Sequence, residues 1–167
     1  MSFELSAQER RRQRSSTTQV KLALRTLRSQ LAVLQHEVGG LVALKDADLD
    51  CLDLINQHGP ITPSALSRLT GLHPATLTGI LDRLERARWI TRQRDPEATD
   101  RRTVRVQPLP DRNRELIGHY AGMNDAMDSL CAAYTPEQLD LIADFLRRTA
   151  EAGATARAGL VGDQPGT

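Results

Sequence analysis

The chain has 167 residues, which suits one domain or a small domain fused to a second element that it needs for folding, and disfavours two independent domains. Aromatic residues make up only 3% of the sequence, so the core must be mainly aliphatic and an all-β sandwich is disfavoured. The formal net charge of +1 excludes a globally basic protein, so a surface for nucleic acid would have to come from uneven placement of charge.

The first 43 residues divide into a polar segment and an apolar repeat. The polar segment includes four clustered arginines: Arg10, Arg11, Arg12 and Arg14. Residues 1–16 have little to bury, so we expect a flexible basic arm. From Val20 to Val38 apolar residues recur at steps of four and three, which predicts a helix with one apolar seam. Gly39 and Gly40 are expected to end it.

Two further helices of unequal length are predicted before residue 72. The first covers about residues 46–57 and stops at Gly59 and Pro60. The second is short, covers residues 62–69 and ends at Gly71. From Ile61 onward, the elements become short and are closely separated by turn residues, which is typical of a helix-turn-helix unit.

The next predicted helix covers residues 74–86 and has two contrasting faces. Pro74 occupies its first position, where the missing amide has no intrahelical partner to lose. One face is apolar and should point to the core: Leu77, Ile80, Leu81 and Leu84. The other face holds small or polar residues: Ala75, Thr76, Thr78, Gly79, Asp82 and Arg83. Such a face suits docking into a major groove, although ordinary solvated helices share its composition.

A two-stranded ribbon is predicted after Trp89. Apolar and polar residues alternate there on both sides of a polar tip at residues 95–102. Arg101 and Arg102 at the tip match the width and negative potential of a minor groove, and Asp100 could orient one guanidinium. A tip of this kind is often only solvated surface, but its place after a helix-turn-helix favours DNA contact. From Arg68 to Arg105 the sequence holds nine arginines against five acids.

The last third of the sequence returns to helical periodicity. Apolar residues step by four and three from Leu116 to Tyr134, and Thr135 and Pro136 open a final helix to about Glu151. The tail at residues 152–167 is rich in glycine and alanine and is expected to be disordered. The fold class predicted is therefore mainly α with a small β-wing, in which a winged helix-turn-helix at residues 46–108 is flanked by helices.

The segment at residues 59–90, followed by Asp95-Pro96 and by residues 100–106, resembles the MarR family over about fifty residues. This resemblance implies a homodimer formed by the N- and C-terminal helices, here residues 17–43 and 111–151. It also implies that the wing arginine of a D-x-R pattern, here Arg102 beside Asp100, enters the minor groove. The candidate DNA-binding residues are Thr62, Ser64, His73, Pro74, Ala75, Thr76, Thr78, Arg83, Asp100, Arg101 and Arg102.

Two positions depart from the family pattern. His73 stands where the family commonly has a serine that caps the recognition helix, and imidazole is a poorer cap, so His73 is a candidate for phosphate contact instead. After the wing, the usual Leu-Thr followed by a glycine is replaced by Leu109-Pro110-Asp111, and Asp111 is expected to cap the next helix.

Members of the family often bind a small aromatic or phenolic ligand between the dimer helices and the DNA-binding region. His36, Cys51 and Tyr120 could line such a pocket here, although each lies in or beside an apolar stripe and core packing is the favoured interpretation. No cysteine precedes Cys51, so thiol sensing near the start of the first helix is not expected. The histidines are scattered without ligand spacing, so neither a metal nor a cofactor is predicted.

These patterns predict a sequence-specific DNA-binding transcription regulator, a repressor, that binds a pseudo-palindromic operator in double-stranded DNA as a homodimer. The alternative is a winged-helix module that binds a protein partner instead of DNA. No nucleophile with a base, paired carboxylates in a pocket or phosphate loop can be placed, so an enzyme is not predicted. The sequence shows no apolar segment of membrane-spanning length and no signal peptide, so we expect a cytoplasmic protein.

Overall fold

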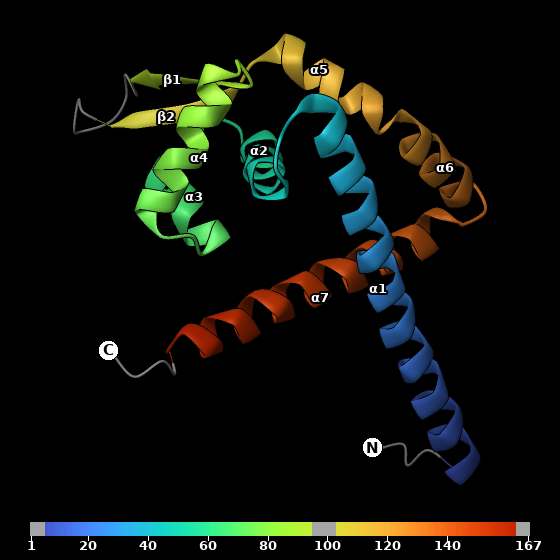
Figure 1. Ribbon diagram of the computed structural model, residues 1–167. Helices are drawn as coiled ribbons and strands as arrows, with labels where there is room; N and C mark the ends of the chain where they lie inside the picture. Colours follow the sequence, from blue (N-terminus) through green and yellow to red (C-terminus); the bar gives the residue numbers. More distant parts are fainter. Residues whose placement is uncertain (1–5, 95–102, 163–167) are drawn as a thin grey trace. The chain divides into compact units, whose positions relative to one another are not determined.

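The computed structural model describes residues 6–94 and 103–162 (Figure 1). The chain forms two compact units. The first unit ends at His119 and the second begins at Tyr120. The predicted fold class is confirmed, because the described chain consists of helices and one small antiparallel sheet. In the described ranges, none of the helices combines the length and hydropathy needed to cross a bilayer.

Helix α1, Ala7–Val42, begins earlier than the sequence pattern predicts. Ser6 and Glu9 form a capping box in which the Ser6 amide donates to Glu9 Oε2 at 2.7 Å and the Glu9 amide donates to Ser6 Oγ at 3.3 Å. The arginines and glutamines that follow are good helix formers. Residues 7–16 are therefore helical, which corrects the expected flexible arm at residues 1–16; residues 1–5 lie outside the described part.

The end of α1 also differs from the expectation. The helix continues through Gly39 and Gly40 to Val42 and ends at Ala43, which has a left-handed φ of 55°. The Leu44 amide donates to the Gly39 carbonyl at 2.9 Å. A Cβ atom on Gly39 would lie only 2.8 Å from the Leu44 carbonyl oxygen. Gly39 therefore serves a close packing contact and not helix termination.

The winged helix follows in the order expected. It comprises α2 (Asp46–His58), α3 (Pro63–Thr70), α4 (Pro74–Arg86), β1 (Ile90–Arg94) and β2 (Val104–Pro108). The two strands pair antiparallel with Arg92 opposite Val106. Ile61 adds an isolated bridge to Val106, with its amide 3.0 Å from the Val106 carbonyl oxygen. This bridge ties the entry of α3 to the wing.

The core of the first unit lies where α2, α3, α4 and the strands meet. Helix α4 contacts α2, α3 and β1, and α2 also contacts β2. The fully buried side chains are Leu49, Cys51, Leu52, Ile55, Leu66, Leu77, Leu81, Leu84, Trp89, Ile90 and Val106. They include three members of the apolar stripe predicted for α4, and the fourth, Ile80, is 2% exposed. The stripe therefore points to the core as the sequence indicates.

Three helices follow the wing. Helix α5, Pro110–His119, belongs to the first unit, and α6, Ala121–Cys131, and α7, Pro136–Gly162, belong to the second. Asp111 does not cap α5, because the helix already begins at Pro110 and Asp111 instead pairs with Arg114 one turn on. The apolar pattern predicted to run on past residue 119 is interrupted at Tyr120, where α5 and α6 are separate helices.

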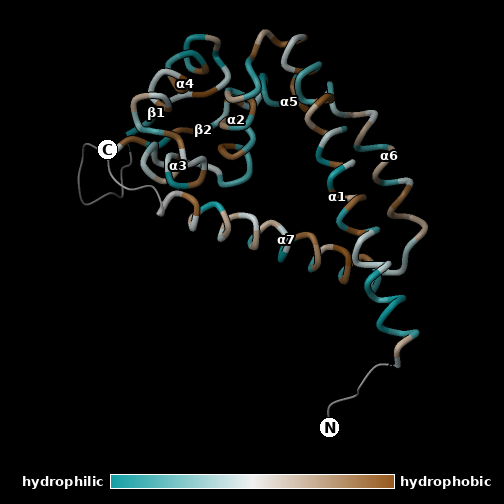
Figure 2. The backbone as a smooth tube through the Cα atoms, turned by 60° about the horizontal axis from the view of Figure 1, so that its bottom comes forward, coloured by the Kyte–Doolittle hydropathy of each residue, from teal (hydrophilic) through white to brown (hydrophobic). Residues whose placement is uncertain are grey.

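Helix α7 extends well beyond the expected end near residue 151. It continues through the alanine-rich segment to Gly162, which corrects the disordered tail predicted at residues 152–167; residues 163–167 lie outside the described part. Alanine has the highest helix propensity of all residues and outweighs the glycines in this segment. Large apolar side chains on α7 remain exposed, and Figure 2 shows hydrophobic segments along it. They include Leu141, Ile142, Phe145, Leu146 and Leu160.

Candidate nucleic-acid interface

The outward face of α4 is exposed as predicted. His73, Pro74, Ala75, Thr76 and Thr78 are all exposed, while the opposite face of the same helix is buried. The Thr78 hydroxyl donates to the Pro74 carbonyl oxygen at 2.9 Å, which leaves its methyl group and both hydroxyl lone pairs available. Short side chains of this kind let a helix approach the floor of a groove closely.

His73 is the N-cap of α4, in contrast to the expectation that imidazole would cap poorly. Its Nδ1 accepts a hydrogen bond from the Ala75 amide at 3.3 Å. An acceptor Nδ1 places the proton of a neutral ring on Nε2. Because the residue is exposed, this Nε2–H remains a donor for an anion outside the helix. Capping and phosphate contact are therefore compatible at this residue.

One of the predicted DNA-binding residues, Thr62, caps helix α3 with its side chain. Thr62 Oγ1 accepts from the Ala65 amide at 3.2 Å and lies 3.1 Å from Ser64 Oγ. Thr62 is half-buried, whereas Ser64 is exposed. Of the two residues, Ser64 is thus the one that a ligand can reach freely.

Arg83 does not point freely outward as the helical pattern suggests. Its Nη2 donates to Asp48 Oδ1 at 2.6 Å and its Nε donates to Asp48 Oδ2 at 3.3 Å. The Asp48 side chain is 3% exposed and that of Arg83 is 42% exposed. The hydrogen bond to Asp48 raises the pKa of Arg83 above its usual value. This two-point contact fixes α4 against α2, so Arg83 is an exposed cation that already has a partner, and its contact with DNA stays a prediction.

A second set of ion pairs fixes the first wing strand against α4. Arg92 Nη2 lies 2.7 Å from Asp82 Oδ1, and its Nη1 lies 3.1 Å from Glu85 Oε2. Asp82, expected on the outward face of α4, therefore binds the wing. Arg94 at the end of β1 is exposed. The tip residues Asp100, Arg101 and Arg102 lie outside the described residues.

The junction after α4 holds features that the sequence pattern does not predict. The guanidinium carbon of Arg112 lies 4.0 Å from the ring centroid of Trp89, which is 1% exposed. Arg88 adopts a left-handed φ of 61°. A shallow hollow of about 400 Å³ lies beside these residues, lined by Ala87, Arg88, Leu109, Pro110, Asp111 and Arg112. No periodicity marks this junction, because its residues come from segments about twenty positions apart.

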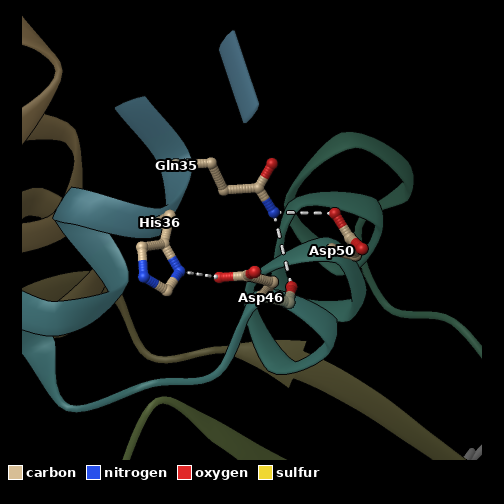
Figure 3. A network of polar contacts seen from close by, with 4 residues as sticks. All are labelled: Gln35, His36, Asp46 and Asp50. Carbon is tan, nitrogen blue, oxygen red and sulfur yellow. Dashed lines mark hydrogen bonds and ion pairs between the residues drawn. The ribbon is translucent and has the colours of Figure 1, made fainter. Parts of the chain in front are cut away.

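The three residues proposed for a ligand pocket lie in different environments. His36 Nδ1 lies 3.2 Å from Asp46 Oδ1 on an exposed seam between α1 and α2, where Gln35 also donates to Asp50 Oδ1 at 2.7 Å (Figure 3). Cys51 is fully buried, and burial raises its thiol pKa to about 11 with added repulsion from Asp50 and Asp48. Tyr120 opens the second unit. An exposed imidazole and a buried protonated thiol do not form one binding surface.

A metal site has no support in the part of the chain that the structure describes. Among these residues, histidine, cysteine, aspartate and glutamate do not gather into a group of three that could hold a metal ion.

The candidate interface consists of the outward face of α4 and the exposed start of α3. The Asp48–Arg83 and Arg92–Asp82 pairs hold it in place.

Comparison with known proteins places this winged helix in a family. Residues 44–104 match the model of the MarR family. An uncharacterized HTH-type transcriptional regulator of Bacillus subtilis strain 168, YcgE, is 33% identical over 120 residues, covering 71% of this chain and 77% of the relative. The chain belongs to the MarR family. It is therefore a transcription regulator and not an enzyme.

Solved structures of MarR-family proteins share the fold. The transcriptional regulator Tm0710 of Thermotoga maritima is 24% identical with a TM-score of 0.58, covering 84% of this chain and 98% of that one. A MarR family protein of Bacillus stearothermophilus is 19% identical with a TM-score of 0.62, covering 83% and 96%. The fold of this MarR-family chain is thus shared over most of its length.

Proposed function

We propose that this MarR-family regulator binds double-stranded DNA sequence-specifically through α4. The observation that carries the proposal is the contrast between the two faces of this helix. Its inner face is buried, and its outer face exposes Ala75, Thr76 and Thr78 beside the His73 cap. A rigidly held helix with a small, hydroxyl-bearing outer face is suited to reading base edges in a major groove.

The proposal includes a homodimer. Helix α7 exposes Phe145 at 45% and Leu146 at 43%, and α1 exposes Leu27 at 43% and Leu31 at 41%. Contiguous apolar side chains of this size on long helices favour association with a second copy. A two-fold dimer would place two recognition helices about 34 Å apart along the duplex and would read a pseudo-palindromic operator.

The wing and the regulatory sign complete the proposal. Arg102, oriented by Asp100 and next to Arg101, is proposed to enter the minor groove, on the strength of the D-x-R pattern alone. A repressor role in the cytoplasm and release by a small aromatic or phenolic ligand follow from the family resemblance. The environments of His36 and Cys51 give that ligand no shared site, so the ligand proposal has the least support.

A binding titration with a matched pair of variants tests DNA recognition. Ala75 and Ala47 are both exposed alanines at the second position of a helix, α4 and α2 respectively. We expect Ala75→Asp to reduce affinity for the DNA upstream of its own gene at least about tenfold, because a carboxylate would face the phosphates. Ala47→Asp should bind like the unaltered protein. Both variants should retain the thermal stability and oligomeric state of the parent.

The outcome that would overturn the proposal is equally concrete. If upstream DNA does not compete better than random duplex for the protein at moderate salt, the protein does not bind DNA sequence-specifically through the outer face of α4. The same conclusion follows if Ala75→Asp binds as tightly as Ala47→Asp. The winged helix would then be a module for protein partners.

A further inference from the structure

Helix α1 carries a strongly uneven charge up to Arg28. Between Glu9 and Glu37 the sequence has no aspartate or glutamate. It has seven cationic residues in that interval: Arg10, Arg11, Arg12, Arg14, Lys21, Arg25 and Arg28. Taking these seven from the 22 lysines and arginines leaves 15 cations against 21 acids elsewhere. The positive charge of the molecule is therefore concentrated on this helix.

Five of the seven cations lie on one face of α1. Successive residues of an α-helix are about 100° apart, and this places five of these side chains within a sector of about 60°. We call them the basic stripe: Arg10, Arg14, Lys21, Arg25 and Arg28. At a rise of about 1.5 Å per residue the stripe is about 27 Å long. All five residues are exposed.

Most of the basic stripe is not neutralised by the residues that the structure describes. In the part of the chain that the structure describes, no carboxylate forms an ion pair with Arg14, Lys21, Arg25 or Arg28. The ion pairs present lie instead between α1 and α2, on α4 with α2 and the wing, on α5 and on α7. The charge of these four residues is thus directed to solvent or to a ligand.

The first three turns of α1 bury no side chain in the described part of the chain. From Gln8 to Gln19 every residue is polar or charged and exposed. A helix that is polar all round is only marginally stable in water, and cations one turn apart repel each other. Binding to a surface of negative charge would remove that repulsion and stabilise the helix. A polyanion therefore fits this segment better than an apolar partner does.

We infer that the basic stripe binds the sugar-phosphate backbone of duplex DNA, as a second contact besides the recognition helix. The inference rests on the proposed function, because α4 would bring duplex DNA to the same molecule and raise the local concentration of phosphates. Duplex DNA presents one negative charge for about every 1.7 Å of its axis, so a row of cations about 27 Å long faces several phosphates. Such contacts add affinity but do not read sequence.

Two pairs of substitutions on the same turns of α1 test the inference in the full-length protein. R10Q/R14Q removes two charges from the stripe, whereas R11Q/R12Q removes two charges that point about 100° and 200° away from it. Fluorescence anisotropy measures binding to a random duplex and to its own upstream DNA over a range of salt concentrations. The slope of log K against log salt should fall by about 1.8 in R10Q/R14Q, about 0.9 for each lost phosphate contact. It should change little in R11Q/R12Q.

The conservative variant R10K/R14K separates charge from helix structure. It should retain the parental slope, because lysine keeps the charge. The preference for upstream DNA over random duplex should be the same in all variants, since the stripe does not read bases. Circular dichroism of the unaltered protein should show a gain of helix on adding random duplex.

Each failure has its own meaning. If the slope is unchanged in R10Q/R14Q while the parent still prefers upstream DNA, the basic stripe does not bind the DNA backbone and the proposed function stays intact. An acidic protein partner for the stripe would give this result. If the slope falls equally in R10Q/R14Q and R11Q/R12Q, the inference is wrong, because the effect then comes from overall charge and not from the face that carries the basic stripe. If the parent shows no preference for upstream DNA, the proposed function fails. The salt slopes on random duplex then still show whether the basic stripe contacts phosphates.

Discussion

The winged helix and the second unit differ in how they bury apolar side chains. In the winged helix, residues such as Leu52, Leu84 and Trp89 are at most 1% exposed. In the second unit, α6 has no buried residue and α7 leaves Leu141 70% exposed. A sequence pattern of equal regularity thus produces a closed core in one region and an open apolar face in the other. The winged helix has a core of its own, while α6 and α7 leave most of their apolar side chains exposed in the described part of the chain.

This difference also separates two kinds of energetic contribution. Contacts in the winged helix should set the free energy of unfolding directly, since they are complete within one chain. Contacts made by the exposed faces of α6 and α7 should set stability only through association, so their effect depends on protein concentration.

The largest expected effect comes from shortening a leucine in each region. Leu52→Ala should lower the free energy of unfolding by about 3 kcal/mol, because it leaves a cavity in a close-packed core. Leu141→Ala should change it by less than about 0.5 kcal/mol at low protein concentration, where an exposed side chain loses little. Urea denaturation at several protein concentrations measures both. Similar losses in the two variants would remove the distinction between the regions.

The Asp48–Arg83 pair tests how firmly the recognition helix is held. Arg83→Met leaves Asp48 buried without its cation and should lower the free energy of unfolding by about 2 kcal/mol, less than for a fully buried pair because the guanidinium is partly solvated. Asp48→Asn keeps one acceptor for Arg83 and should lose about half as much. Chemical denaturation of both variants checks the order. A larger loss in Asp48→Asn would contradict the role given to Arg83.

The end of α1 offers a matched pair of glycines. Gly39→Ala should destabilise the protein by about 1 to 2 kcal/mol, because its Cβ would lie 2.8 Å from the Leu44 carbonyl oxygen and 3.2 Å from Leu49 Cδ1. A Cβ atom on Gly40 would have no such neighbour within 4 Å, so Gly40→Ala should raise stability by up to about 1 kcal/mol. Thermal melts compare the two. Equal melting temperatures would mean that the close approach is unimportant.

The smallest expected effect concerns Asp53 in α2. Burial, and then the negative charge of Asp50, raise the pKa of the Asp53 carboxyl above its usual value. Ionised Asp53 therefore opposes folding, by an amount that grows as pH rises from the unfolded pKa through the raised folded pKa and is full above it. Asp53→Asn should be more stable than the parent at neutral pH and lose this advantage at acidic pH. Denaturation of both proteins at several pH values checks this, and a stability difference that is constant with pH would contradict it.

Much of the winged helix could be predicted from the sequence because its signals are local. Proline at the first position of α3 and α4, glycine at the turn between them and the leucine and isoleucine stripe of α4 each act within one element. The order of helices and strands follows from them. Local signals do not show which polar groups meet across elements. The contact of Arg83 with Asp48 could not be predicted for this reason, because the two residues lie 35 positions apart.

The chain ends were predicted less well for a different reason. Charge and small residues at residues 1–16 and 152–167 are typical of disorder, but arginine, glutamine and alanine are also good helix formers. The Ser6–Glu9 capping box is visible in the sequence and indicates the start of α1. His73 shows the same limit, since the preference of caps for serine or aspartate is statistical and a ring nitrogen can also accept an amide.

The buried indole of Trp89 has a practical consequence for studying this regulator. It is the single tryptophan of the chain, it lies at the junction of α4, β1 and α5, and the Arg112 guanidinium covers its ring. Intrinsic tryptophan fluorescence therefore reports on that junction alone. Opening of the winged helix would shift the emission to longer wavelength, whereas melting confined to α7 would leave the spectrum unchanged. The molecule thus carries its own optical probe for distinguishing these two events.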